Sequence, residues 1–258
     1  MESANQVISA LTSGPKAGLV MDFDGVLSPI TDDPAASDLL PDTAAILAHL
    51  ATRLPLVALL SGRPVRFLAD RAGIPGVELH GSYGLERLTA GGVEQVPEAD
   101  RWNDAVAQAT ALLHEEFDGI EGIHVEDKSL AVAVHWRRAP DQEAAISRIT
   151  PVLRRATETF GLRREPGKMV EELRMPVDQD KGTALRSIIR RHGLVVVAYA
   201  GDDRGDLPAF AAAAAAGGHC LVVDGADAAP EVAAVPGSHF DGPEHFRTWL
   251  QCLGDALG

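Results

Sequence analysis

Two aspartates, two residues apart, are the first side chains of this sequence that could do chemistry. Asp22 and Asp24 follow the apolar run 18–21 and precede Gly25. Such a run is typical of a buried parallel strand, and a glycine lets the chain turn sharply at the strand's end. Residues two apart on an extended segment project to the same side, and ligands bind at the carboxyl ends of strands in open α/β sheets. We therefore expect the two carboxylates to face one substrate.

The charge of these carboxylates decides what they could do to a phosphate ester. With an ordinary pKa of about 3.9, Asp22 is an anion near neutrality and could attack phosphorus without a general base. A protonated Asp24 could give its proton to the departing alkoxide and then deprotonate the hydrolytic water. The pair would repel an incoming phosphate, so a divalent cation is expected, and Mg2+ suits a site of carboxylates, a carbonyl and waters. On spacing alone, a helix cap or a loop explains the two aspartates equally well.

A second strand end carries groups that could bind phosphate. Asp42 is expected to cap a helix over 43–53. The apolar run 54–60 that follows ends at Ser61-Gly62-Arg63, where another helix is expected to begin. The hydroxyl and the backbone N–H groups of this segment could hold phosphate oxygens, aided by the amino terminus of that helix. By themselves, the same three residues are also an ordinary capped helix start.

Two later segments carry a lysine and a group of acids. Asp180 is expected to cap a helix that begins with Lys181, whose ammonium group could bind the phosphoryl group and offset the nucleophile's charge. The apolar run 195–200 then ends in the acidic loop 201–206. Asp202 is the expected metal ligand, and Asp203 or Asp206 is the second ligand or a partner that orients waters. An exposed helix lysine and an acidic surface turn are the alternatives.

In this order, the segments 22–28, 61–63, 181 and 201–206 resemble the four motifs of the haloacid dehalogenase phosphatase superfamily. Because residue 24 is an aspartate, the first of these segments resembles that of the phosphatase and phosphomutase branch of the superfamily. The resemblance implies an α/β fold with a Rossmann-like core, a parallel sheet and an aspartyl-phosphate intermediate. It implies catalytic roles for Asp22, Asp24 and Lys181, substrate binding by Ser61, Gly62 and Arg63, and Mg2+ binding by Asp22, Asp24, Asp202 and Asp203.

The segment 81–86, Gly-Ser-Tyr-Gly-Leu-Glu, narrows the resemblance. It looks like the Gly-Asn/Ser-His-Gly-hydrophobic-Glu stretch of the trehalose-6-phosphate phosphatases, with Tyr83 where that family usually has His. On physical grounds alone, Tyr83 could equally be a half-buried aromatic beside a glycine turn. Because tyrosine replaces the usual histidine, both roles of Tyr83, substrate contact and packing residue, are kept as alternatives.

Between residues 99 and 177 the pattern changes to helix, paired strands, helix, paired strands. We expect helices at 101–117 and 141–160, a hairpin turning at 127–128 and a second hairpin turning at 166–167. This αββαββ insert resembles the C2B-type cap of the sugar phosphatases in the superfamily. The expected domains are a core of 1–98 and 178–258 and a cap of 99–177.

Three segments of the predicted cap carry polar residues that resemble family stretches. Segments 125–129, 135–137 and 167–174 look like Glu-x-Lys, His-Tyr/Trp-Arg and Gly-Lys-x-x-x-Glu-x-Arg. The resemblance implies that Glu126, Lys128 and Glu172 recognise the sugar, and such groups can hold a polyol by charge-assisted hydrogen bonds. One extra residue before Pro176 leaves Glu171 as an alternative to Glu172. Without the phosphatase motifs, a solvated hairpin face with ion pairs would explain this region better.

Length, charge and cysteine content set further expectations. A chain of 258 residues suits one large and one small domain, and a net charge of −14 argues against nucleic acid or an anionic membrane as a partner. Cys220 and Cys252 form no metal-binding pattern and are expected to be buried thiols in a reducing cytoplasm. The segment 1–16 lacks the features of a signal peptide, which also favours a cytoplasmic location. We expect a monomer.

Together these features predict a Mg2+-dependent phosphatase acting on a sugar phosphate, with trehalose 6-phosphate as the first choice. Another disaccharide, pseudo-disaccharide or glycosyl-acid phosphate is the nearest alternative. A phosphomannomutase would need a cap that excludes water. A sugar-phosphate sensor without turnover is the alternative from another class, and a pure binder would have no use for the acid/base group at Asp24.

Overall fold

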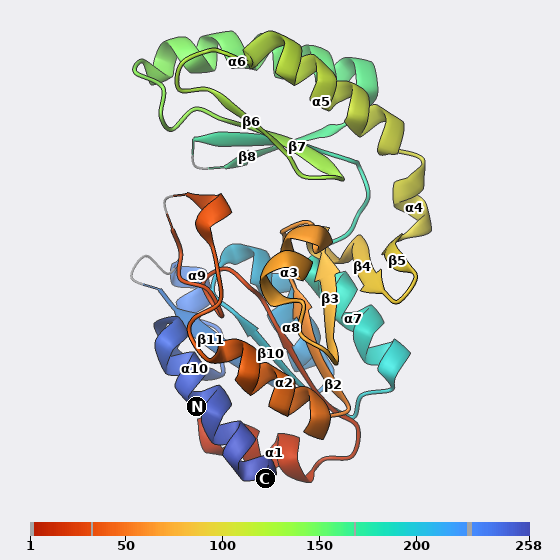
Figure 1. The fold of residues 1–258 in the computed structure, drawn as a ribbon, viewed down its shortest axis with the longest axis vertical. Coiled ribbons are helices and arrows are strands. Elements are labelled where there is room, and N and C mark those ends of the chain that lie inside the picture. The colour runs from red at the N-terminus through yellow and green to blue at the C-terminus, as the bar shows by residue number, and fades with distance from the viewer. Residues whose placement is uncertain (1–2, 32, 168, 226–228) are drawn as a thin grey trace. The chain divides into compact units, whose positions relative to one another are not determined.

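The structure is a computed structural model that describes residues 3–31, 33–167, 169–225 and 229–258. The chain divides into two compact units, one formed by residues 1–94 and 179–258 and the other by residues 95–178. We call the first unit the core and the second the cap (Figure 1). The domain boundaries expected from the sequence stay a prediction.

The core is built on an eight-stranded sheet with the strand order β12-β11-β10-β1-β2-β3-β4-β5. Its first six members run parallel, and β4 joins β3 in the antiparallel direction. Strands β1 and β2 are buried along their whole length, because helices cover both faces of the sheet. The α/β class is therefore confirmed. The strands are β1 (Ala17–Met21), β2 (Leu56–Leu60), β3 (Val77–Gly81), β4 (Glu86–Thr89), β5 (Gly92–Gln95), β10 (Val196–Gly201), β11 (His219–Asp224) and β12 (Ser238–Asp241).

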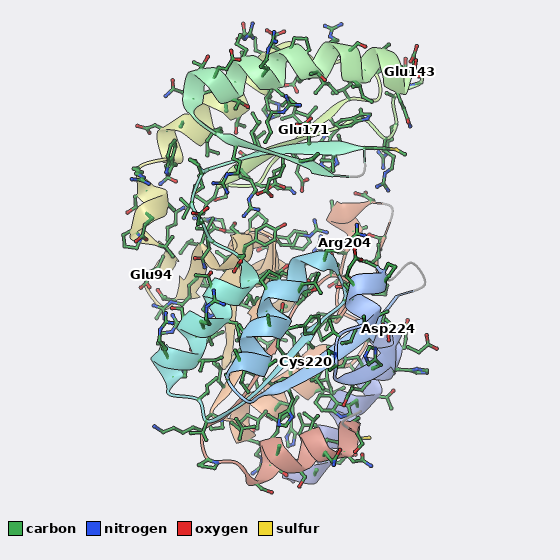
Figure 2. The ribbon with its side chains drawn as sticks, turned by 180° about the vertical axis from the view of Figure 1, so that it is seen from behind. Glu94, Glu143, Glu171, Arg204, Cys220 and Asp224 are labelled. Carbon is green, nitrogen blue, oxygen red and sulfur yellow. The ribbon has the colours of Figure 1, made fainter. Side chains whose placement is uncertain are left out.

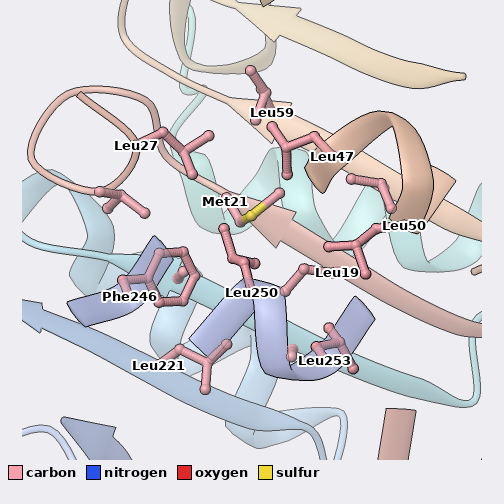
Figure 3. Packing of buried hydrophobic residues seen from close by; sticks show 14 of the residues in the cluster. Leu19, Met21, Leu27, Leu47, Leu50, Leu59, Leu221, Phe246, Leu250 and Leu253 are labelled. Atoms are coloured by element: carbon pink, nitrogen blue, oxygen red, sulfur yellow. The ribbon is translucent and has the colours of Figure 1, made fainter. Parts of the chain in front are cut away.

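Alternate residues of the central strand β1 point into two separate hydrophobic layers. Leu19 and Met21 lie in one layer, where residues of helices α2 and α10 pack against them (Figure 3). Val20 lies in the other, where helices α7 and α8 pack. The core helices are α1 (Ala4–Ser13), α2 (Thr43–Arg53), α3 (Val65–Ala72), α7 (Lys181–His192), α8 (Leu207–Ala215), α9 (Pro230–Ala233) and α10 (Gly242–Leu257), with short 3-10 turns η1 (Pro34–Ala36), η2 (Ser82–Gly84) and η3 (Arg204–Asp206).

The cap is a four-stranded antiparallel sheet with the order β6-β7-β9-β8, covered on one face by two long helices (Figure 1). Val125, Val132, Val134 and Leu173 are buried, and in strands β6 and β9 the residues beside Val125 and Leu173 are polar. This alternation is that of a sheet with one covered face. The αββαββ order is confirmed. The elements are α4 (Pro97–Asp100), α5 (Asn103–Phe117), β6 (His124–Asp127), β7 (Ala131–His135), α6 (Gln142–Phe160), β8 (Arg163–Gly167) and β9 (Val170–Arg174).

Helix ends and cysteines give two corrections to the sequence predictions. Asp180 caps α7 as expected, with its Oδ1 atom accepting a bond of 2.7 Å from the N–H of Thr183. Asp42 precedes α2 but has φ of +66° and makes no side-chain capping bond, so the predicted cap is wrong. Cys220 is buried, but Cys252 is exposed, because it lies off the buried stripe of α10. Among the residues described, none of the helices has the length and apolar character needed to cross a bilayer.

Candidate functional site

The carboxyl ends of three neighbouring strands bring the candidate residues of the core together. Strand β1 lies between β10 and β2, so its end places Asp22 between the loops that carry Asp202 and Ser61. The N–H of Asp22 donates to the carbonyl of Ala200 at 2.9 Å, which continues the β1–β10 ladder into the loop. Parallel strands thus supply the convergence that the sequence predicted.

Lys181 joins the first and last of these loops. Its buried Nζ atom lies 2.6 Å from Oδ2 of Asp22 and 2.7 Å from Oδ1 of Asp206. Helix α7 approaches α8 closely because position 182 is glycine, where a Cβ would lie 2.4 Å from the carbonyl oxygen of Pro208. Burial alone would lower the pKa of Lys181, but the carboxylates of Asp206 and Asp22 raise it well above its ordinary value. Lys181 is therefore a fixed cation between two acids.

Asp206 organises the acidic loop and was only an alternative in the sequence analysis. Its Oδ1 atom accepts from Lys181 and, at 2.5 Å, from the hydroxyl of Tyr199. Its Oδ2 atom accepts from the backbone N–H groups of Asp202 at 3.0 Å and Asp203 at 3.1 Å. Burial opposes ionisation, yet these donors and the lysine charge keep the pKa of Asp206 below its ordinary value. Asp206 is a buried anion that holds the loop in place.

Asp22, Asp202 and Asp206 offer carboxylate oxygens that all lie within 4.8 Å of one another. Burial raises the pKa of Asp22 to about 7, although the Lys181 charge lowers it. Burial, followed by the charge of Asp22 and Asp206, raises the pKa of Asp202 to about 9. Lys181 contacts Asp22 and Asp206, so a negative charge on Asp202 is the least compensated of the three. Oxygen ligands with excess negative charge fit a hard divalent cation such as Mg2+.

Asp203 and Asp24 stand outside that group of three. The Oδ1 atom of Asp203 accepts from the N–H of Gly205 at 2.7 Å and caps η3. Both carboxylate oxygens of Asp24 accept from the guanidinium of Arg63, at 2.7 and 3.0 Å. The metal roles of Asp203 and Asp24 stay predictions.

The segment that carries Ser61 is fastened to the turn that carries Tyr83. The N–H of Tyr83 donates to the carbonyl of Ser61 at 2.9 Å, and the N–H of Ser82 donates to the carbonyl of Arg63 at 2.8 Å. Tyr83 has φ of +59°, and its ring lies against Gly62, where a Cβ would be 2.9 Å from the ring's Cζ. The glycine at 62 is therefore required by the aromatic ring as well as by the turn.

Two further residues of the core site were missed in the sequence analysis. The buried carboxylate of Glu86 accepts from the hydroxyl of Ser82 at 2.8 Å and from the N–H of Val65 at 3.0 Å, which ties the turn to the start of α3. Tyr199 is fully buried and reaches Asp206. The only sequence signal for Tyr199 was a tyrosine within an otherwise apolar strand.

The cap brings its three predicted sugar-binding residues together on one face of its sheet. Glu126 and Glu172 are both in register with Ala133, so their side chains project to the same side. The Nζ atom of Lys128 lies 2.8 Å from Oε2 of Glu172 and 3.8 Å from Oε2 of Glu126. His135 also contacts Glu126, with its Nε2 atom 2.8 Å from Oε2. This half-buried cluster of charged groups is suited to binding hydroxyl groups.

The alternative residue Glu171 lies on the other side of that sheet. Glu171 is in register with Val134, which is buried beneath the helices, and its carboxylate forms an ion pair with Arg164 (Figure 2). Because successive residues of a strand point to opposite faces, Glu171 cannot share the cluster of Glu172. The geometry favours Glu172 as the third member.

Comparisons with known proteins point to one family. The family model described as trehalose-phosphatase matches residues 20–226. The trehalose-phosphate phosphatases of Mycobacterium marinum and Mycobacterium avium are each 38% identical, over 202 and 205 residues that cover 76% and 77% of this chain and 51% of each relative. The chain therefore spans about half the length of these curated relatives.

Solved structures show the same fold. A trehalose-6-phosphate phosphatase related protein has a TM-score of 0.78 and 20% identity, covering 92% of this chain and 97% of that protein. The C-terminal domain of Candida albicans trehalose-6-phosphate phosphatase has a TM-score of 0.76 and 20% identity, covering 98% and 97%. A haloacid dehalogenase-like hydrolase from Bacteroides thetaiotaomicron has a TM-score of 0.64 and 13% identity, covering 93% and 100%. With four-fifths of its length matched by the family model, the chain belongs to the trehalose-phosphatase family.

Proposed function

We propose that this chain hydrolyses trehalose 6-phosphate to trehalose and phosphate through an aspartyl-phosphate intermediate on Asp22. The observation that carries the proposal is the buried carboxylate of Asp22, placed at the end of β1 with Lys181 at 2.6 Å and Asp202 in the same acidic group. The curated relatives at 38% identity are trehalose-phosphate phosphatases. A nucleophilic carboxylate, a fixed cation and a cation-binding acid are the groups that phosphoryl transfer needs.

In this proposal, the carboxylates of Asp22 and Asp202 would hold Mg2+, and Asp24, whose carboxylate is bound by Arg63, would contribute its backbone carbonyl. The bound ion would neutralise the charge of the phosphoryl oxygens. Asp206 already accepts four hydrogen bonds and keeps Lys181 and the loop in position. Asp203 would act on the waters around the ion from its position at the cap of η3.

The proton transfers fall to Asp24. As the Asp22 oxygen forms its bond to phosphorus, the bond from phosphorus to the sugar oxygen breaks, and Asp24 gives that oxygen its proton. Asp24 then takes a proton from the water that attacks the aspartyl phosphate, which releases phosphate and restores both acids. The segment Ser61-Gly62-Arg63 would hold the phosphoryl oxygens with its hydroxyl and backbone N–H groups.

Sugar recognition is assigned to the cap. Glu126, Lys128 and Glu172 lie on the face of its sheet that the helices leave open, within one network of ion pairs. A bound polyol would replace parts of this network by charge-assisted hydrogen bonds to its hydroxyls. These contacts would select the disaccharide, while the core performs the reaction.

The test is phosphate release from a panel of sugar phosphates, including trehalose 6-phosphate, with and without Mg2+. The wild-type protein should turn over trehalose 6-phosphate fastest and lose that activity when Mg2+ is chelated. Asp22→Asn keeps the size of the side chain but removes the nucleophile, so release should fall to background while circular dichroism and the thermal midpoint confirm a folded protein. Substantial residual turnover would refute Asp22 as the nucleophile. Binding of the sugar phosphate without turnover by the wild type would support the sensor instead.

A further inference from the structure

The guanidinium of Arg63 is held on three sides within the core. Its Nε and Nη2 atoms donate to Oδ2 and Oδ1 of Asp24 at 2.7 and 3.0 Å, and Nη2 also donates to Oγ of the buried Ser37 at 3.3 Å. Its Cζ atom lies 4.6 Å from the centroid of the Phe67 ring. Contacts to a carboxylate, a hydroxyl and an aromatic face fix both the position and the plane of this group.

The supports of Arg63 come from several segments of the core. Phe67 belongs to α3 and meets the ring of Phe23 edge to face, with centroids 6.0 Å apart. Phe23 is fully buried and lies between the two aspartates in the sequence. The backbone carbonyl of Arg63 accepts from Ser82. The arginine therefore connects the loop after β1 to the loop after β2 through one two-bonded ion pair.

We propose that Arg63 is a positioning residue for proton transfer by Asp24, an inference that rests on the proposed function. Two parallel N–H···O bonds fix the plane of the Asp24 carboxyl group, which a single bond or a point charge could not do. Each carboxylate oxygen has two lone pairs and uses one of them to accept from Arg63. The other lone pair remains available to carry the transferred proton. The guanidinium itself stays charged throughout and takes no part in the transfer.

The nature of the leaving group separates this role from direct binding of phosphate. An arginine that binds phosphoryl oxygens would accelerate every ester to the same extent, because all esters share the phosphoryl group. An arginine that positions the general acid matters only where the leaving oxygen needs a proton. A p-nitrophenolate leaves as a stable anion, whereas phenolate needs a proton more and a sugar alkoxide needs it most.

The experiment measures kcat/KM for Arg63→Gln and Arg63→Lys on p-nitrophenyl phosphate, phenyl phosphate and trehalose 6-phosphate. This ratio reports the steps up to departure of the leaving group and is independent of the later attack by water. We expect the loss to rise from less than ~3-fold for p-nitrophenyl phosphate to about 100-fold for trehalose 6-phosphate, the low end of general-acid contributions. Arg63→Lys should lose nearly as much, because it keeps the charge but not the fork.

Three control variants complete the test. Asp24→Asn should show the same dependence on the leaving group, and the double variant with Arg63→Gln should lose no more than Asp24→Asn alone, because the two residues act as one unit. Arg71→Gln is the matched control, since its guanidinium lies 5.7 Å from the same Phe67 ring and donates to the carbonyl of Ala35 at 3.0 Å. It should keep the wild-type dependence. Thermal unfolding shows whether each variant is folded. If Arg63→Gln is unfolded, Arg63→Lys takes its place in the test.

Equal losses on all three esters would overturn the proposal in favour of phosphate binding. A kcat/KM that is unchanged in Arg63→Gln would also overturn it, as would wild-type kcat/KM in Arg63→Lys. A wild-type protein that hydrolyses none of the esters would refute the proposed function itself, and the role of Arg63 with it. The failures of the two proposals are distinguishable, because the results that overturn only the role of Arg63 are seen with an active wild-type protein.

Discussion

Replacing Gly25 by alanine should inactivate the protein by displacing Asp202, while leaving the fold intact. Gly25 follows the two aspartates of the first loop and has φ of +74°. A Cβ at this position would lie 2.0 Å from Oδ2 and 2.2 Å from Cγ of Asp202. The left-handed backbone costs a residue other than glycine roughly 1–2 kcal/mol, which is small against a typical stability of about 5–15 kcal/mol.

The size of the effect follows from the clash. Heavy atoms do not approach a Cβ within 3.0 Å, so the Asp202 carboxylate must withdraw by about 1 Å. Its backbone cannot easily follow, because the N–H of Asp202 is bound to Oδ2 of Asp206. Misplacement by this distance costs about 100-fold in rate, and we expect a loss of that order in kcat/KM. The Mg2+ concentration that gives half-maximal activity should rise as well.

The assay is phosphate release across a Mg2+ titration, with thermal unfolding measured on the same samples. Gly217→Ala is the matched control, since Gly217 has φ of +70° but a Cβ there would meet no atom of the described residues within 4 Å. Both variants should lose similar stability, and only Gly25→Ala should lose activity and affinity for Mg2+. The reasoning is refuted if Gly25→Ala keeps the wild-type Mg2+ dependence, or if the two variants lose activity equally.

Two more outcomes are expected from the cap and from the edge of the core. Glu126→Ala should lower kcat/KM for trehalose 6-phosphate by about 10- to 100-fold, the effect of losing one or two hydrogen bonds to a charged group, and should leave kcat/KM for p-nitrophenyl phosphate unchanged. Glu171→Ala, on the other face of that sheet, is the control. Equal losses on both esters would contradict selective recognition. The hydrogen bond from His80 at 3.2 Å is the main reason that the pKa of Glu78 is lowered to about 2. Because this folded-state value lies below the ordinary 4.5, the stabilisation is present above pH 4.5 and lost as pH falls toward 2. The stability difference between wild type and Glu78→Gln, measured by denaturant unfolding, should therefore shrink over that range, and a difference that stays constant with pH would contradict this role.

The parts of the fold that were predicted correctly are those with a strong apolar pattern. Strands β1, β2 and β10 are almost continuous buried runs, and in the cap hairpins, β6 and β9 place polar residues beside the buried Val125 and Leu173. Strand β5 was missed because none of its residues is buried, which leaves no apolar signal. Cys252 was misjudged from its apolar neighbours, although the buried spacing of Phe246, Trp249, Leu250 and Leu253 places it off the stripe.

The sequence named the acids at the strand ends, whose roles stay predictions, but it could not show how the environments of these acids differ. The acids of the loop 202–206 are the same residue type, yet the pKa of Asp206 is lowered while that of Asp202 is raised to about 9. The difference arises because Lys181 and Tyr199, which come from other elements, both point at Asp206. Sequence spacing contains no information about such contacts.

This division also determines how a cation would enter the site. Because burial and the neighbouring carboxylates hold the pKa of Asp202 near 9, its carboxyl group carries a proton at neutral pH when no ion is bound. A carboxyl group must lose that proton to coordinate Mg2+, so ion binding and proton release are coupled. Asp206, by contrast, has a lowered pKa and accepts four hydrogen bonds from groups of the protein. Under the proposed function, Asp202 is therefore the acid expected to respond to Mg2+, and it is also the acid that the Cβ of an alanine at position 25 would displace.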